Sequence, residues 1–275
     1  MNQVFAMSIS GRNNLFISSV EKKIYLKVFS LSMTKASAQL KKLIKESSHI
    51  VAFTGAGISA ESGISTFRGA GGLWSKYDPE IYANFDFFMK DPTYYWQFFR
   101  DERYPTLKKA KPNKAHYALA ELEKQGKLYR VITQNIDGLH QQAGSTDVIE
   151  LHGTSQTVSC LNCKNKYTLD ETYEKLKSDL PPLCTCGGRL KTDTILFGES
   201  LPQHALDQAT LAAHYCDLFL VLGSSLVVYP AAALPEIAQQ HNAKLVIINI
   251  DPTPLDDVAD IVIHQSASTV LSKVI

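Results

Sequence analysis

The segment HIVAFTGAGISAESG, residues 49–63, decides the fold class of this chain. Its first half is an apolar run typical of a strand buried on both faces, and it ends at the glycine pair Gly55 and Gly57. A strand that runs into a glycine-rich turn and then a helix lets backbone N–H groups approach a pyrophosphate. The third glycine, Gly63, comes too late for the G-x-G-x-x-G pattern. A tight strand-to-helix turn without a nucleotide therefore fits this segment nearly as well.

The rest of the chain repeats this alternation of buried strands and helices. Further strands are predicted at residues 128–133, 148–151, 194–197, 217–222, 244–249 and 261–263. Helices are predicted after Thr34 and over residues 114–125, 202–215 and 231–241. Short apolar strands separated by helices predict an α/β fold, with a Rossmann-like parallel sheet covered by helices on both faces.

Two segments interrupt this alternation and are predicted to form a smaller domain. Residues 70–112 are rich in aromatic side chains and have helical character, and residues 158–191 contain four of the five cysteines. The Rossmann-like domain is then assigned to residues 34–69, 113–157 and 192–275, with a helical insertion at 70–112 and a zinc-binding insertion at 158–191.

Residues 1–33 are basic, rich in serine and poor in acidic residues. They lack the apolar stretch and small-residue cleavage site of a secretory signal. We expect a disordered extension, or an annotated start upstream of a true start at Met33. An organelle-targeting segment is the alternative.

The composition is that of a globular protein, with 45% apolar and 20% charged residues and a formal net charge of +1. This charge does not indicate direct nucleic-acid binding. No apolar run reaches the 18 or more residues of a membrane span. We expect a soluble, monomeric, cytoplasmic protein that binds no membrane.

Four cysteines have the spacing of a metal site. Cys160 and Cys163 are separated by two residues, and Cys184 and Cys186 by one residue followed by two glycines. Four thiolates suit a tetrahedral, structural zinc ion, whereas a catalytic zinc keeps an open position. The usual second pair is Cys-x2-Cys, so this one departs from the pattern, and four unrelated cysteines are the alternative. Cys216 is interpreted as a core residue.

Polar residues follow several predicted strands. They are TQNIDGLH at 133–140, LHG at 151–153, GSS at 223–225 and NID at 249–251. Open α/β sheets bind ligands at the carboxyl ends of their strands, so these groups indicate a ligand site at one edge. A polar helix cap and a histidine with a purely structural role are the alternatives for the first two.

Together, GAGISAESGISTFRG (55–69), TQNIDGLH, LHG, the paired cysteines, FGE (197–199), GSSL and NID resemble the sirtuins in order and spacing, over about residues 36–275. Ser65 departs from the proline common in that family. The resemblance implies NAD bound between a Rossmann-like and a smaller zinc and helical domain. It also implies NAD-dependent removal of acyl groups, such as acetyl, from protein lysine, which yields nicotinamide, free lysine and an O-acyl-ADP-ribose.

The same resemblance implies roles for individual residues. His152 would accept a proton from a ribose hydroxyl, and Asn135 and Asp137 would complete the catalytic set, while Phe67 would close over the reacting ribose. The implied NAD contacts are Gly55, Ala56, Gly57, Ala60, Phe67, Arg68, Gln134, Asn135, Ile136, Asp137, Gly223, Ser224, Ser225, Asn249, Ile250, Asp251 and Ala267. An acyl-lysine protein or peptide would add as an extended strand, with contacts at Phe197, Gly198, Glu199, Val227 and Val228.

The preferred acyl group is expected to be neutral. Sirtuins that accept acidic acyl chains share a Tyr-x-x-Arg pair, and here Phe99 and Glu102 fall on that pair. A shift of register would bring Arg100 or Arg103 there instead. Two other functions remain open: an NAD-dependent protein ADP-ribosyltransferase, and a dinucleotide-binding protein without turnover.

Overall fold

The apolar run after His49 forms strand β1 (Ile50–Thr54), and all five of its residues are buried in the computed structural model. The structure describes residues 34–69 and 71–275, of which residues 36–275 form one compact unit. The predicted extension at residues 1–33 lies outside the described residues. The helix predicted after Thr34 is present and ends at residue 46.

Strand β1 lies inside a six-stranded parallel sheet with the order β3-β2-β1-β7-β8-β9. Its other strands are β2 (Leu128–Thr133), β3 (Val148–Glu150), β7 (Leu218–Leu222), β8 (Lys244–Ile248) and β9 (Ile261–Ile263). If only the six strands of this sheet are numbered along the chain, β7, β8 and β9 become strands 4, 5 and 6. The order is then 3-2-1-4-5-6, which is that of Rossmann folds. The predicted α/β fold class is therefore confirmed. The order reverses between β1 and β7, which is where such sheets bind ligands.

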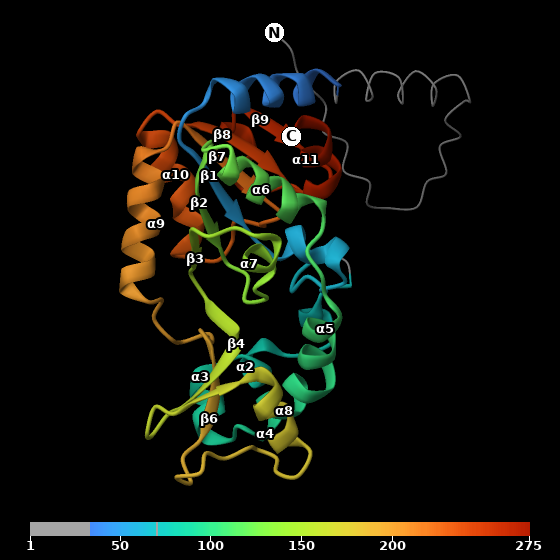
Figure 1. The fold of residues 1–275 in the computed structure, drawn as a ribbon, viewed down its shortest axis with the longest axis vertical. Coiled ribbons are helices and arrows are strands. Elements are labelled where there is room, and N and C mark those ends of the chain that lie inside the picture. Colours follow the sequence, from blue (N-terminus) through green and yellow to red (C-terminus); the bar gives the residue numbers. More distant parts are fainter. Residues whose placement is uncertain (1–33, 70) are drawn as a thin grey trace, which may run out of the picture. The chain divides into compact units, whose positions relative to one another are not determined.

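Helices cover both faces of this sheet, with α9 and α10 on one side and α6 and α11 on the other (Figure 1). Val51 and Phe53 of β1 point to the same face of the sheet. They pack in one apolar cluster with Phe219 and residues of α9 and α10. The helices are α6 (Lys114–Lys124), α7 (Leu139–Ala143), α9 (Gln203–Tyr215), α10 (Leu234–Gln240) and α11 (Ala267–Val274), with the short 3₁₀ turns η4 (Ala231–Ala233) and η5 (Asp256–Val258).

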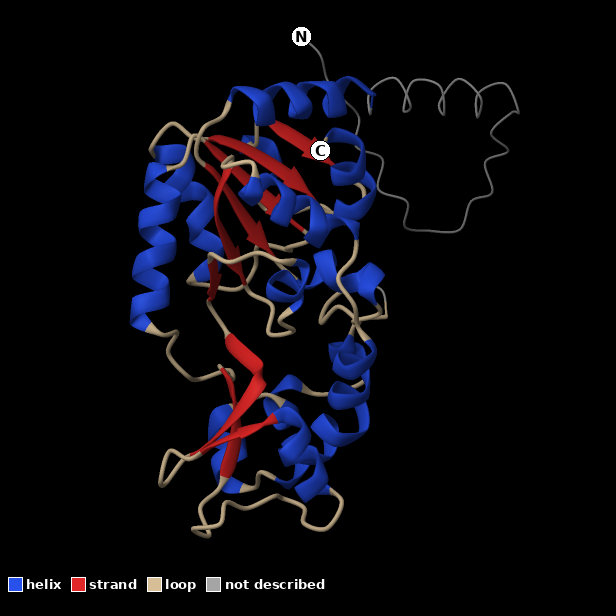
Figure 2. Cartoon of the chain, viewed as in Figure 1, coloured by secondary structure: helices blue, strands red, loops and turns tan. Residues whose placement is uncertain are grey.

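The second sheet is antiparallel and has the order β5-β4-β6 (Figure 2). Its strands are β4 (Gly153–Cys160), β5 (Lys166–Thr168) and β6 (Leu190–Thr194), and α8 (Leu169–Leu176) follows β5. The prediction of a strand at 194–197 was wrong. The strand ends at Thr194 and pairs with β4, and Phe197 then bonds through its backbone to Ala83 and Phe85.

The aromatic segment is helical, as predicted. After the 3₁₀ turn η2 (Leu73–Ser75) it forms α2 (Pro79–Tyr82), α3 (Phe85–Lys90), α4 (Thr93–Phe98), the π-helical turn η3 (Phe99–Arg103) and α5 (Tyr104–Lys109). Its aromatic rings share one core with the second sheet, and the indole N–H of Trp96 donates to the carbonyl of Leu190 at 3.1 Å. No helix within the described ranges combines the length and apolar character that crossing a bilayer requires.

Candidate active site

A cavity of about 870 Å³ lies at the carboxyl ends of β1, β2, β7 and β8, and residues of the helical segment also line it. Of the residues expected to be catalytic or to contact NAD or an acyl-lysine peptide, Asp137 and Val227 lie outside its wall. The remainder line it: Gly55, Ala56, Gly57, Ala60, Phe67, Arg68, Gln134, Asn135, Ile136, His152, Phe197, Gly198, Glu199, Gly223, Ser224, Ser225, Val228, Asn249, Ile250, Asp251 and Ala267. The topology therefore brings together groups from widely separated parts of the sequence.

The glycine turn after β1 packs backbone to backbone against the turn after β7. The N–H of Gly57 donates to the carbonyl of Gly223 at 2.8 Å. A Cβ on Gly57 would lie 2.7 Å from the Cα of Gly223, and Gly223 itself has a φ of 65°. Only glycine permits this approach without displacing backbone. After this turn the chain continues as the 3₁₀ helix η1 (Ala56–Ser62). A helix was predicted at this point, and it is present as a short 3₁₀ helix.

Asn135 and Asp137 are held by a network beneath the cavity. The amide nitrogen of Asn135 donates to the carbonyl of Gly55 and to Ser59 Oγ, both at 3.1 Å. Ser59 Oγ donates to Asp137 Oδ2 at 2.7 Å, and Asp137 Oδ1 accepts from the backbone N–H of Leu139 at 2.9 Å. Both oxygens of Asp137 are thus engaged within the protein. Asp137 acts here by fixing Ser59, and through it the orientation of Asn135.

Two buried histidines extend this network, and the sequence analysis assigned neither a role. His116 Nε2 lies 3.5 Å from Ser59 Oγ, and His140 Nε2 lies 3.0 Å from Thr54 Oγ1. Burial lowers the pKa of His116 to about 4 and that of His140 to about 3, so both rings are neutral. His140 belongs to a motif already singled out, whereas His116 lies on a helix whose pattern gave no sign of this position.

His152 lies between β3 and β4 and lines the cavity. Its Nδ1 is 3.0 Å from the carbonyl oxygen of Gln134. A carbonyl can only accept a hydrogen bond, so Nδ1 carries the proton and Nε2 keeps its lone pair. Burial lowers the pKa of His152, which favours the neutral ring further. The geometry is that of a general base held in one tautomer.

The helical segment supplies a further wall of the cavity, for which the sequence analysis had named Phe99 and, with a shifted register, Arg103. Tyr95, Phe99 and Arg103 line the cavity, as do Trp74 of η2 and Thr194 at the end of β6. The density of aromatic residues was the available signal, but it did not indicate which residues face inward.

Glu102, which sequence register had placed beside Phe99, does not line this wall. Its carboxylate accepts a hydrogen bond from the hydroxyl of Tyr77 at 2.7 Å.

The four paired cysteines meet at the end of the second sheet. All four sulfur atoms lie within 4.8 Å of one another, and Cys160–Cys186 and Cys163–Cys184 are each separated by 3.6 Å. A tetrahedral zinc ion with Zn–S bonds of 2.3 Å would separate its sulfur ligands by roughly 3.8 Å. The donor set therefore fits a closed zinc site. None of these cysteines lines the cavity.

Comparison with known proteins agrees with this arrangement. A sequence model of the Sir2 family matches residues 55–230. The NAD-dependent protein deacetylase of Caldivirga maquilingensis is 49% identical over 235 residues, which cover 85% of this chain and 90% of that protein. The NAD-dependent protein deacylase 2 of Archaeoglobus fulgidus is 48% identical, with coverage of 85% and 92%.

Solved structures are similar over the same region. One, described as the structural basis for the mechanism and regulation of Sir2 enzymes, is 47% identical with a TM-score of 0.82, and covers 88% of this chain and 97% of its own. A complex of Sir2 with a p53 peptide and NAD+ is 43% identical with a TM-score of 0.80, and covers 86% and 95%. This chain belongs to the Sir2 family.

Proposed function

We propose that this chain is an NAD-dependent protein-lysine deacetylase that removes acetyl and other neutral acyl groups and yields nicotinamide, O-acyl-ADP-ribose and free lysine. The observation that carries this function is a base-competent His152 on the wall of the same cavity as the glycine turn of residues 55–57. Its relatives are named NAD-dependent protein deacetylases and deacylases, and a solved relative holds NAD+ together with a peptide.

NAD fits the part of the cavity built by the strand ends. Gly55, Gly57 and Gly223 let two backbone turns pack together at the cavity wall, where a pyrophosphate would meet backbone groups, and Arg68 supplies a cation on the same wall. Asn249 and Asp251 follow β8 and would serve the adenosine half. When bound, NAD supplies an anomeric carbon with nicotinamide as the leaving group. The residues that would hold this carbon near a lysine amide would act by proximity, which offsets several kcal/mol of the barrier.

His152 and the Asn135 network carry the chemical part of the proposal. With Nδ1–H donated to Gln134, Nε2 of His152 accepts the proton of a ribose hydroxyl and makes that oxygen a nucleophile. The amide nitrogen of Asn135 is used by Gly55 and Ser59, so its Oδ1 is presented as an acceptor in a fixed position. Phe67 covers the reacting region and excludes water, which favours the lysine amide over solvent.

An acyl-lysine peptide would lie as an extended strand between residues 197–199 and 227–228. Within the described residues, the backbone N–H and carbonyl of Phe197 are already bonded to Ala83 and Phe85. Phe197 therefore contributes its half-exposed side chain, while the backbone of Gly198 and of the opposite segment would pair with the peptide.

Zinc, in this proposal, is held by Cys160, Cys163, Cys184 and Cys186 and stabilises the second sheet without taking part in the reaction.

The test is a mass spectrum of the products formed from an acetyl-lysine peptide, NAD and purified protein. O-acetyl-ADP-ribose and free lysine in equal amounts support deacetylation. A protein or peptide that gains ADP-ribose would instead support the alternative transferase activity, and no turnover would support a binding protein.

A further inference from the structure

Arg103 is a buried cation on the cavity wall that the proposed reaction does not use. Only 7% of the residue is exposed, and it lines the cavity. Across residues 34–69 and 71–275, its guanidinium has neither an ion-pair partner nor a hydrogen-bond acceptor. Burial lowers the pKa of the guanidinium, whereas the nearby Tyr95 and the carboxylate of Asp137 favour its charge.

The guanidinium also lies over an aromatic ring. The guanidinium carbon of Arg103 lies over the ring of Phe67, 5.3 Å from its centroid. A cation over a ring face is attracted by the electron density of the ring, and more strongly where water is excluded. Phe67 also packs against Trp74, with centroids 5.2 Å apart, and Trp74 reaches Phe197 at 6.4 Å. Arg103 is thus in contact with the residue proposed to cover the reacting ribose.

The backbone explains why this arginine points into the cavity. Residues 99–103 form a π-helical turn, closed by the N–H of Tyr104 donating to the carbonyl of Phe99. Phe99 and Arg103, four residues apart, lie on the same face of this turn, and both line the cavity. Glu102 is turned outward to Tyr77. π turns are frequent at functional sites.

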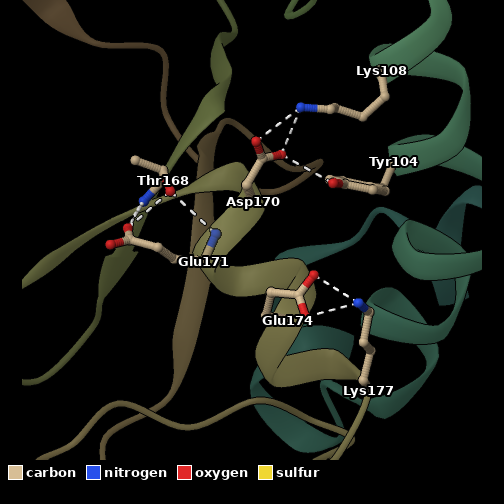
Figure 3. Close-up of polar contacts among 7 residues, drawn as sticks. All are labelled: Tyr104, Lys108, Thr168, Asp170, Glu171, Glu174 and Lys177. Carbon is tan, nitrogen blue, oxygen red and sulfur yellow. Dashed lines mark hydrogen bonds and ion pairs between the residues drawn. The ribbon is translucent and has the colours of Figure 1, made fainter.

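The segment that carries Arg103 is fixed from behind by α8 (Figure 3). The hydroxyl of Tyr104 donates to Asp170 at 3.0 Å, and the ammonium of Lys108 reaches the same carboxylate at 2.9 Å. The rings of Tyr104 and Tyr173 stack with centroids 3.7 Å apart. These contacts hold Arg103 in place independently of the loop that carries Phe67.

We infer that Arg103 is a positioning residue that holds Phe67 over the reacting end of the cavity and so keeps water from the anomeric carbon. This inference rests on the proposed function. When Phe67 is released, water attacks instead of the lysine amide: the glycosidic C–N bond breaks, a C–O bond forms, and NAD and water give ADP-ribose, nicotinamide and a proton.

The experiment measures nicotinamide released per lysine deacetylated, using the full chain with saturating NAD and an acetyl-lysine peptide. This ratio does not depend on how much of each preparation is folded. Each deacetylation releases one nicotinamide, so the excess of this ratio over one measures NAD lost to water. Arg103→Met keeps the apolar stem but removes the cation, and we expect this excess to rise by roughly 2- to 30-fold, the range of one cation–π interaction. Arg103→Lys keeps the charge and should fall nearer the wild type.

Two comparisons make the result specific. Phe67→Leu alone should raise the amount of nicotinamide released without deacetylation. Arg103→Met should add nothing further in that background, because the interacting partner is gone. Arg100→Met is the matched control, since Arg100 lies in the same turn but pairs with Asp101 at 2.7 Å. It should keep the wild-type ratio.

The inference is overturned if Arg103→Met leaves the ratio unchanged, or raises it equally with and without Phe67. It is also overturned if Arg103→Met only raises the KM of the peptide, since Arg103 would then be a substrate contact. Wild-type protein that forms no O-acetyl-ADP-ribose would defeat the proposed function itself, which separates the two failures.

Discussion

Acid should destabilise this protein through the two histidines buried beneath the cavity. Burial lowers the pKa of His140 to about 3 and that of His116 to about 4, against 6.5 for an exposed histidine. Below pH 6.5 the unfolded chain therefore binds protons that the folded chain does not. The free energy of unfolding is then complete above pH 6.5 and falls as the pH drops towards the two folded-state pKa values.

The size of this effect follows from the same pKa values. Each histidine contributes a slope of up to about 1.4 kcal/mol per pH unit, so the pair costs about 4 kcal/mol between pH 7 and pH 5. His140 alone, with a difference of 3.5 pH units between 6.5 and about 3, accounts for about 5 kcal/mol once the pH reaches its folded pKa. Losses of this size are a large share of the stability of a typical domain.

The assay is urea unfolding, followed by tryptophan fluorescence, at pH values from 7.5 to 5. His140→Gln should reduce the pH slope of the unfolding free energy by about 1.4 kcal/mol per unit below pH 6, because one of the two groups is removed. Acid would also protonate the thiolates that hold the proposed zinc ion, so the difference between variant and wild type is the quantity to compare. His204→Gln, at an exposed position of α9, is the control and should keep the wild-type slope.

A His140→Gln variant with the wild-type slope would refute this reasoning. It would mean that the imidazole of His140 either carries its charge in the folded state or reaches water. The buried contact with Thr54 would then not keep the ring neutral.

Three further predictions concern the zinc site, the proposed base His152 and the glycine turn after β7. Cys184→Ser should lose the approximately one zinc ion per chain that metal analysis of the wild type should find, together with most of the folded yield; zinc-free active protein would contradict this. His152→Ala should lower deacetylation by roughly 100- to 10,000-fold while NAD still binds by calorimetry, and the lowered pKa of His152 places the acid limb of wild-type activity below pH 6.5. Gly223→Ala would put a Cβ 2.3 Å from the backbone nitrogen of Ile58, so NAD affinity and Tm should both fall; Gly126→Ala has a similar φ of 70° but open space around it, and should cost only about 1 kcal/mol with NAD binding intact.

The parallel sheet could be predicted because its strands are buried on both faces and therefore appear as continuous apolar runs. The five buried residues of β1 are the clearest case. The same signal misled at residues 194–197, where an apolar run follows β6. Apolar character does not specify a pairing partner, and here the preceding residues pair with β4 in the antiparallel sheet.

The strand-end half of the candidate site could be predicted for a topological reason. Parallel strands present their carboxyl ends at one edge, so any polar residue that follows such a strand is brought to the same cavity. Arg103 could be named only as one of two arginines that a shifted register would bring to the cavity, because the i→i+5 bonding of this turn leaves no simple sequence period. His116 was missed because its burial beside Ser59 is a tertiary contact of an ordinary helical position.

The places where the two insertions leave the main sheet explain why they build the cavity. The helical segment lies between β1 and β2, and the second sheet and α8 lie largely between β3 and β7. In a parallel sheet, each of these connections departs from the carboxyl edge, which is the ligand edge. An enlarged connection at that edge must either turn away or cover the ligand. Here the two enlarged connections pack on each other through Asp170, Tyr104 and Lys108, and Arg103 adjoins this contact. A zinc ion held by the four cysteines would touch no reactant, yet it would still affect the reaction by stabilising the support on which the cavity wall rests.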